Sequence, residues 1–388
     1  MTTLSFVTDK KGDCTESFMN GLSGNSRLLG SVASLRLQVA PAISAATKIG
    51  ISQSVLSLHS NQPENIFEIS KATFCLVAKM SSNNLPNIQS MIVANLAAIF
   101  YAKNRGAKII LLYSDNWIHS SKITGNDYID SCRSLTRGFY TDLLSISDYV
   151  VYPTQALLRM TANNVSKQAQ CMVIEDPWQL NNWHESRHLP VEPDDPIKLI
   201  WFGSNLNIKY LILHLPSILS VKAKAHKLEL TILSARMALD ECQSFFLKYK
   251  NLFAGWTLRL VLWDASNQPG QLEDELSRAH ICLIPSDPDD PSKAGVSPNR
   301  LVDAIKGGCI SIASPMESYR ELRNLSLQGG NFRDLLLEAL RRYKEIASNL
   351  QQHREIALEK YNPKYNQKSW WKLMLRLTNA ESNHNLSV

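Results

Sequence analysis

Four side chains that could bind a nucleotide cluster in the segment from residue 285 to residue 322. Lys293 comes first, Asn299 and Arg300 follow, and Asp303 lies one helical turn further on. The two basic side chains can contribute positive charge near phosphate oxygens, and the beginning of a helix adds unpaired backbone N–H groups. Asp303 can accept hydrogen bonds from ribose hydroxyls, as acidic residues do in other nucleotide-binding folds. The pattern predicts a diphosphate site; the alternative is an ordinary capped helix in which Asp303 pairs with a neighbouring base.

The residues that flank these four predict where the helix begins and ends. Ser297 can cap a helix whose first residue, Pro298, has the fixed φ that is favoured at this position. Gly307 and Gly308 predict its end. An apolar strand precedes the loop, and another follows the glycines at 309–314. The helix is therefore expected to begin at the carboxyl end of a buried parallel strand.

Short apolar runs alternate with helix-length segments along most of the chain. The predicted strands cover residues 4–7, 53–58, 73–78, 107–113, 148–152, 170–174, 198–203, 229–233, 258–263, 281–285 and 309–314. Apolar strands separated by helices are typical of parallel sheets that are buried on both faces. The fold class is therefore expected to be α/β, with two Rossmann-like doubly wound domains.

A change in composition divides the chain between the two series of strands. Residues 176–196 are rich in Pro, Asp, Asn and His and have no sustained period, which indicates a linker. An N-terminal domain is thus expected over 1–175 and a C-terminal domain over 197–355. The last residues, 356–388, form a helical tail that is expected to pack back toward the N-terminal domain. Its tryptophans are expected to be core anchors.

The composition narrows the classes of function. Hydrophobic residues make up 44% of the chain and charged residues 20%, which excludes a disordered protein. The net charge is +6, but the sequence contains no motif that reads RNA or DNA, so no nucleic-acid partner is expected. Basic residues are more frequent between Arg341 and Arg376. They could contact acidic lipid at a membrane surface or form a solvated helix face. Seven scattered cysteines and the absence of a signal-peptide pattern favour a cytoplasmic protein.

Two further acidic patterns suggest sites. Asp115 follows a strong predicted strand, so it could face a cleft as a catalytic group, or it could form a local turn. Asp287 and Asp289 have the spacing of an Asp-x-Asp metal motif. Prolines on either side stiffen that loop, and solvation of the loop is the better interpretation. No metal is therefore expected.

The segment 285–322 resembles the donor-binding region of GT-B glycosyltransferases, in the family-four-like (group 1) branch. The matching positions are Lys293, Asn299, Arg300, Asp303, Gly308, Ala313 and Ser314. "WFGSNLN" (201–207) resembles the first strand and turn of the same domain in that family. "ISDYVVYPTQAL" (146–157) and "GNSRLLGSVASLRLQVAPAI" (24–43) resemble parts of its N-terminal domain.

The resemblance implies two domains facing a cleft, with a nucleotide sugar as donor and co-substrate and no other cofactor. Gly203 would let the backbone approach phosphate, and Asp303 would bind ribose. Lys209 would fill the position of a lysine that holds the diphosphate, or it would be a catalytic group. The N-terminal domain would present an unidentified acceptor, a glycan, a lipid or a protein. Transfer would be metal-independent and retaining.

Two positions depart from the family's pattern. Gly295 stands where many members have a glutamate that contacts the donor sugar, and Ser204 or Asn205 replaces an arginine that holds the diphosphate. Two alternatives therefore stay open. One is a catalytically silent nucleotide-sugar-binding protein, and the other is a nucleotide-sugar epimerase of the same fold.

Overall fold

The computed structural model describes residues 3–8, 38–57, 73–78, 85–119, 126–190, 192, 194–222, 226–264, 268 and 270–384. The chain forms two compact units. Unit 1 comprises residues 1–177, 289–297 and 363–388, and unit 2 comprises residues 178–288 and 298–362. The chain therefore leaves unit 2 for one short loop, returns to it, and finishes in unit 1. Residues 24–37, most of the segment 24–43 that resembles part of the family's N-terminal domain, lie outside the described residues.

Unit 1 contains a six-stranded parallel sheet. Its strands, in spatial order, are β2 (Ser52–Ser57), β1 (Thr3–Thr8), β3 (Phe74–Val77), β4 (Lys108–Leu112), β5 (Tyr149–Tyr152) and β6 (Gln170–Val173). The described side chains of β3, β4 and β5 are almost all buried, because helices cover both faces. This confirms the expected fold class for the first series of strands.

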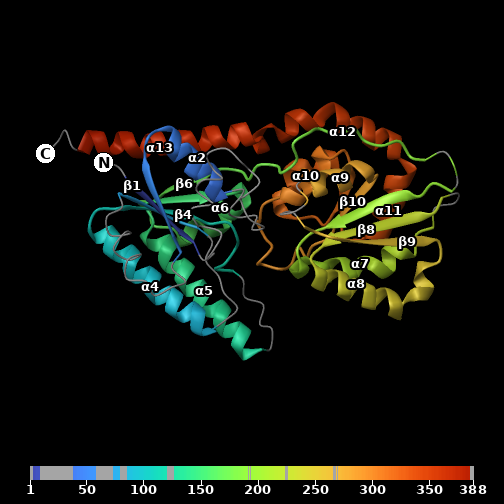
Figure 1. Cartoon of the computed structure of the whole chain (residues 1–388), viewed down its shortest axis with the longest axis horizontal. Helices are drawn as coiled ribbons and strands as arrows, with labels where there is room; N and C mark the ends of the chain where they lie inside the picture. The colour runs from blue at the N-terminus through green and yellow to red at the C-terminus, as the bar shows by residue number, and fades with distance from the viewer. Residues whose placement is uncertain are drawn as a thin grey trace. The chain divides into compact units, whose positions relative to one another are not determined.

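The helices of unit 1 divide between the two faces of its sheet. They are α2 (Ala40–Lys48), α4 (Leu85–Asn104), α5 (Asp127–Ile146), α6 (Gln155–Thr161) and α13 (Pro363–His384). Alternate strand residues form two cores. One core packs against α4 and α5, and the other packs against α2 and α13. Figure 1 shows α13 lying along α2, as their contacts require. The C-terminal helix thus completes the cover of a sheet built by the N-terminal residues.

Unit 2 contains the second six-stranded parallel sheet. Its spatial order is β12 (Ser326–Gln328), β11 (Ile310–Ala313), β10 (Ile281–Ile284), β7 (Ile197–Phe202), β8 (Leu228–Ser234) and β9 (Trp256–Leu262). The chain builds outward from β7 through β8 to β9 and then crosses back to β10. The order of the strands therefore reverses between β7 and β10.

Two apolar cores cover the faces of the second sheet. One core contains α7 (Ile208–Leu219), α8 (Arg236–Lys248) and α11 (Phe332–Arg341). The other contains α9 (Gln271–Arg278), α10 (Asn299–Lys306), the 3-10 helix η6 (Glu317–Leu325) and α12 (Tyr343–Leu358). None of the described helices in either unit has the length and apolar character needed to cross a membrane.

The segment expected to be a linker packs against unit 2 from Trp178 onward. Backbone N–H of Trp178 donates to Tyr361 O at 3.0 Å. The buried ammonium of Lys306 lies 4.1 Å from the ring centroid of Trp178 and 4.6 Å from that of Trp183. Burial lowers the pKa of Lys306, although nearby carboxylates oppose the shift. The segment thus belongs to a core of unit 2, which its Pro- and Asn-rich composition did not predict.

Candidate functional site

The point where the strand order reverses in unit 2 forms the centre of the candidate site. In open α/β sheets, ligands bind beyond the carboxyl ends of the strands at such a point. Gly203 directly follows β7, and its N–H donates to Leu233 O at 3.3 Å. The hydroxyl of Ser234, which ends β8, donates to Gly203 O at 2.7 Å. Hydrogen bonds from the neighbouring strand therefore fix the turn after β7.

Close packing explains the glycine at this turn. A Cβ atom added to Gly203 would lie 3.2 Å from the indole ring of Trp201 and 3.5 Å from Nη1 of Arg300. A side chain would occupy the space between the turn and the guanidinium. The structure thus brings together two residues, Gly203 and Arg300, that are separated by almost a hundred positions.

Arg300 lies in the first turn of α10. Its Nη1 is buried and has no hydrogen-bond acceptor in the part of the chain that the structure describes. A buried donor on a charged group without a partner costs on the order of 2 kcal/mol or more, so native structures rarely keep one without a reason. The helix begins at Asn299 after Pro298, one residue later than expected. The guanidinium of Arg300 therefore lies beside the Gly203 turn, where it can bind an anion.

Asp303 lies one turn further along α10 and is fully buried. Its Oδ1 accepts a hydrogen bond from the backbone N–H of Gln179 at 2.8 Å, and its Oδ2 accepts one from Nε2 of Gln179 at 3.0 Å. In this conformation a ribose hydroxyl reaches the carboxylate only if Gln179 moves. The ribose role stays a prediction, and the structure adds a second role, the attachment of residues 178–184 to α10.

Lys293 belongs to the short loop that lies with unit 1. Nδ2 of Asn116 donates to Pro291 O at 2.8 Å, and the hydroxyl of Thr154 donates to Gly295 O. Gly295 has a φ of +79°, and a Cβ atom there would lie 2.9 Å from the backbone of Leu157. A glutamate cannot occupy this position, so its absence follows from the close approach of the loop to α6.

The remaining predicted residues have ordinary surroundings. Lys209 is exposed on α7, and its ammonium lies 4.8 Å from the ring centroid of Tyr210. Asp115 is half-buried after β4, and its carbonyl accepts from the N–H of Trp117 at 2.9 Å. Asn299 is half-buried at the start of α10. No described residues place three or more His, Cys, Asp or Glu side chains where they could hold a metal ion.

Two serines position the site; Ser234 was missed, and Ser314 was named only as a matching position without a role. Ser234 holds the Gly203 turn, as described above. The hydroxyl of Ser314 donates to Ser286 O at 2.8 Å and accepts from the N–H of Ser286 at 2.8 Å, so it fixes the loop that follows β10. Both serines directly follow or end buried strands. A small hydroxyl residue at the carboxyl end of a strand is the signal that could have identified them.

Some basic residues between Arg341 and Arg376 form salt bridges or hydrogen bonds within the protein. Arg342 forms salt bridges with Glu338 and Glu345, each at 2.6 Å. Arg354 is buried, and its guanidinium donates to His184 O. These contacts favour a structural role for the two arginines. Contact with a membrane surface stays a prediction.

Comparison with known proteins identifies the fold. No protein-family model matches the chain, and no curated protein is similar to it in sequence. HepE of Anabaena, solved in complex with UDP-glucose, matches 97% of this chain over 100% of its own, with a TM-score of 0.60 and 10% identity. A sucrose-phosphate synthase from Thermosynechococcus elongatus matches 98% over 100% of its own chain, with a TM-score of 0.62 and 13% identity. TarM matches 78% over 54% of its own chain, with a TM-score of 0.53 and 13% identity. The chain has the GT-B fold of these structures.

Proposed function

We propose that this protein is a glycosyltransferase that takes a sugar from a nucleotide-sugar donor. The observation that carries the proposal is the buried Nη1 of Arg300, which has no acceptor among the described residues and lies beside the Gly203 turn at the carboxyl edge of a GT-B sheet. HepE, which shares the fold, is solved with UDP-glucose. The expected ligand of the Arg300 guanidinium is the donor's diphosphate.

The same geometry supports a mechanism with little covalent chemistry from the protein. An acceptor hydroxyl attacks the anomeric carbon on the face that the diphosphate leaves, the bond to the diphosphate oxygen breaks with its electrons staying on that oxygen, and the hydroxyl proton passes to the departing diphosphate. Arg300 and the N–H groups at the start of α10 would stabilise the negative charge that develops on the leaving oxygen. Because their positions are fixed before the reaction, little reorganisation is needed. We propose that this step is metal-independent and retaining, and that it takes place in the cytoplasm.

One observation favours a second candidate, a silent binding protein. Position 295 has neither space for a Cβ atom nor a backbone angle that suits one. The glutamate that contacts the donor sugar in many relatives of the resembled family is therefore excluded here. A silent protein would still bind the nucleotide through Arg300, so binding alone does not distinguish the two candidates.

Turnover distinguishes them. Incubation of the protein with UDP-, GDP-, ADP-, CDP- and dTDP-sugars, followed by ³¹P NMR, should show release of one nucleoside diphosphate. The Arg300→Ala variant should lose this activity. The anomeric proton of the released or transferred sugar reports retention or inversion. Binding without release would establish the silent protein, and an isomerised but intact nucleotide sugar would establish the epimerase.

A further inference from the structure

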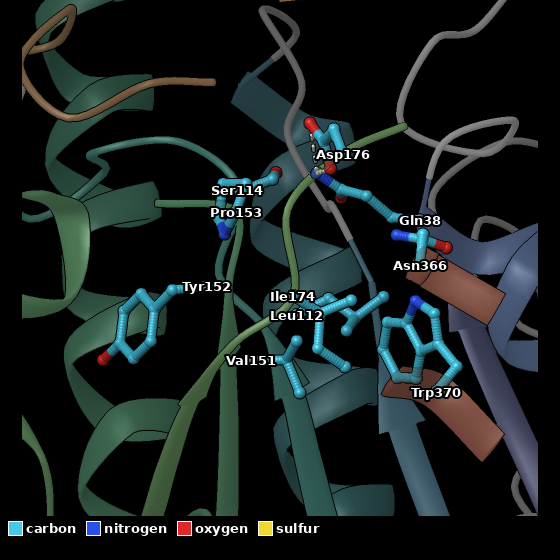
Figure 2. A pocket seen from close by; sticks show the side chains of 10 residues that line it. All are labelled: Gln38, Leu112, Ser114, Val151, Tyr152, Pro153, Ile174, Asp176, Asn366 and Trp370. Carbon is cyan, nitrogen blue, oxygen red and sulfur yellow. Dashed lines mark hydrogen bonds between the residues drawn. The ribbon is translucent and has the colours of Figure 1, made fainter. Parts of the chain in front are cut away.

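The C-terminal helix α13 is held on unit 1 by one of its faces. Trp370 is 1% exposed and belongs to the core that contains Leu112 and Ile174. Nδ2 of Asn366 donates to Glu175 O at 2.7 Å. Figure 2 shows the side chains of Asn366 and Trp370 directed from α13 toward the strands of the sheet. Because this face fixes the helix, its opposite face is presented to solvent.

The solvent-exposed face of α13 carries a regular row of positive charges. Residues four apart lie on the same side of a helix. Four exposed basic side chains of α13 follow this spacing: Lys364, Lys368, Lys372 and Arg376. We call them the α13 basic face, which extends over about 18 Å of helix. The helix α2, which packs against α13, carries Lys48 and no acidic residue.

The α13 basic face is not neutralised by carboxylates of its own helix. Between residues 363 and 380 the sequence contains no Asp or Glu. Lys368, Lys372 and Arg376 form no ion pair with any residue that the structure describes. Arg342, by contrast, pairs with two glutamates within one helical turn. Like charges four residues apart repel one another, and a face that only needs to be solvated usually carries both signs. This arrangement therefore favours a negatively charged partner.

Two aromatic side chains lie among these cations. Tyr365 is 47% exposed and Trp371 is 42% exposed, and Leu375, one turn beyond Trp371, is half-buried. Tyr and Trp are enriched where a membrane meets water, because their rings are apolar and also carry a polar group. A helix that combines cations with such rings on one side suits a position on a membrane, with its axis in the plane of the surface. Single-stranded nucleic acid is instead bound in a positively charged groove, whereas the outer side of a helix is convex.

We propose that the α13 basic face binds the surface of a membrane that contains acidic lipid. Its cations contact the lipid phosphates, and the rings of Tyr365 and Trp371 lie at the level of the headgroups. The helix lies on the membrane and does not cross it, since none of the described helices has the length and apolar character for crossing. The proposal does not depend on the proposed glycosyltransferase function, because none of these residues belongs to the nucleotide site.

Sedimentation of the full-length protein with vesicles tests this proposal. One set of vesicles contains phosphatidylcholine alone, and the other contains equal parts of phosphatidylcholine and phosphatidylglycerol. The protein should bind the acidic vesicles and stay in solution with the neutral ones. Binding should weaken as NaCl is added, because salt screens exposed charges. Equal binding to both sets, binding that salt does not weaken, or no binding to either would overturn the proposal.

A variant that lacks three of the cations locates the binding surface. It carries Lys368→Gln, Lys372→Gln and Arg376→Gln. Its binding to the acidic vesicles should weaken on the order of 100-fold, because each cation near an acidic surface contributes about fivefold. The three side chains are exposed, so the Tm of the variant should stay close to that of the unchanged protein.

A matched variant removes the same charge from unit 2. It carries Lys222→Gln, Arg236→Gln and Lys250→Gln, all at exposed positions. This variant should bind the acidic vesicles as the unchanged protein does. An equal loss of binding in the two variants would assign the effect to net charge alone and would overturn the α13 basic face as the binding surface.

Trp371 distinguishes a membrane from another polyanion. Trp371→Ala keeps all four cations but removes apolar area that would enter the headgroup region, so binding to the acidic vesicles should weaken severalfold. A DNA duplex, offered as a competing polyanion, should bind the unchanged protein more weakly than the acidic vesicles do. Tighter binding of the duplex, or vesicle binding that Trp371→Ala leaves unchanged, would overturn the assignment of the partner as a membrane.

Discussion

Two arginines of unit 2 lie toward opposite edges of one sheet and have opposite surroundings. Arg259, on β9, donates to both carboxylate oxygens of Glu275 and, at 3.2 Å, to the hydroxyl of Thr231. Arg300, beyond the carboxyl end of β7, keeps a buried nitrogen without an acceptor among the described residues. The sequence gives both the same side chain, and only the structure shows which one is still available. From this difference we expect that residues on the amino-terminal side of the sheet contribute to stability, and we propose that the carboxyl edge binds the ligand.

Other residues on the amino-terminal side are equally well satisfied. Nδ1 of His280, just before β10, accepts from Lys198 N at 2.9 Å, and Nε2 lies 3.1 Å from His188 O. Because Nδ1 accepts, Nε2 must carry the proton and donate, which fixes a neutral tautomer. Gly308, just before β11, lies against the backbone of residues 184–185. Substitutions on this side should therefore change stability and leave ligand affinity alone.

Gly308→Ala should have the largest effect on stability. Gly308 has a φ of +83°, and an added Cβ would lie 2.6 Å from the carbonyl oxygens of His184 and Glu185. Backbone atoms cannot move aside cheaply, so unit 2 should lose about 3 kcal/mol or more of its free energy of unfolding. Urea unfolding, followed by hydrogen exchange of β10 and β11, measures the loss.

Gly270→Ala is the matched control for that substitution. Gly270 has a φ of +91° but nothing within 4 Å of an added Cβ. It should cost only the left-handed backbone penalty, about 1 kcal/mol. Equal losses in the two variants would contradict the close packing of residues 184–185 against Gly308.

Acidification should weaken unit 2 through His280. Burial lowers the pKa of His280 from 6.5 to about 4, because the charged imidazolium is poorly solvated inside the protein. Above pH 6.5 the histidine is neutral in both states and its contribution is complete. Between pH 6.5 and 4 the unfolded state takes up the proton first, so roughly 3 kcal/mol of stability is lost as the pH falls.

The pH dependence of urea unfolding measures this contribution. His280→Gln should flatten the dependence between pH 4 and 6.5. His353→Gln, at an exposed position on α12, should leave it unchanged. A slope that survives in His280→Gln would assign the effect to other groups.

Asp303→Ala should destabilise unit 2 by about 2 kcal/mol, because the N–H and side-chain amide of Gln179 lose a charged acceptor in a buried position. Gln179→Ala keeps the carboxylate and removes its side-chain partner. If Asp303 also binds ribose, Gln179→Ala should bind a nucleoside diphosphate at least as tightly as the unchanged protein. Calorimetric titration of both variants provides the comparison, and weaker binding in Gln179→Ala would contradict a ribose role for Asp303.

Arg259→Ala should have the smallest effect. It removes the charged partner of the buried Glu275, but the arginine itself is 38% exposed, so solvent screening limits the loss to about 1 kcal/mol. Thermal unfolding should show a small fall in Tm. Affinity for a nucleoside diphosphate should not change. A fall in that affinity would contradict the separation of the stabilising amino-terminal side from the carboxyl edge.

The sequence predicted the strands because buried parallel strands are apolar runs that need no distant information. The eleven expected strands all form, with ends that differ by a few residues, while the short β12 at residues 326–328 was missed. The place of Trp178 was not predictable in this way. Its segment looks like a linker by composition, and only the structure shows that Trp178 is buried in a core of unit 2 beside Lys306. Similarly, Trp370 is buried as expected, whereas Trp371 is 42% exposed, because one side of α13 faces solvent.

The position of the candidate helix was predictable from the sequence, but its long-range contacts were not. A helix that begins after a strand with Asn, Arg and Asp in its first turns predicts a nucleotide site, which stays a prediction, and the structure places Arg300 beside the Gly203 turn. Sequence spacing could not show that Gln179, more than a hundred positions away, holds the carboxylate of Asp303. It also could not show that the glycine at position 295 is demanded by the backbone of Leu157. Such long-range contacts arise from the fold as a whole.

The most direct test of the account is a calorimetric titration of nucleoside diphosphates into three proteins: the unchanged chain, Arg300→Ala and Arg259→Ala. One of UDP, GDP, ADP, CDP and dTDP should bind the unchanged chain. Arg300→Ala should weaken that binding about 10- to 100-fold, the usual value of a charge-assisted contact, with little change in Tm. Arg259→Ala should bind as the unchanged chain does. Equal affinity in all three proteins, or no binding by any diphosphate, would contradict the assignment of Arg300 as the ligand for the donor's diphosphate.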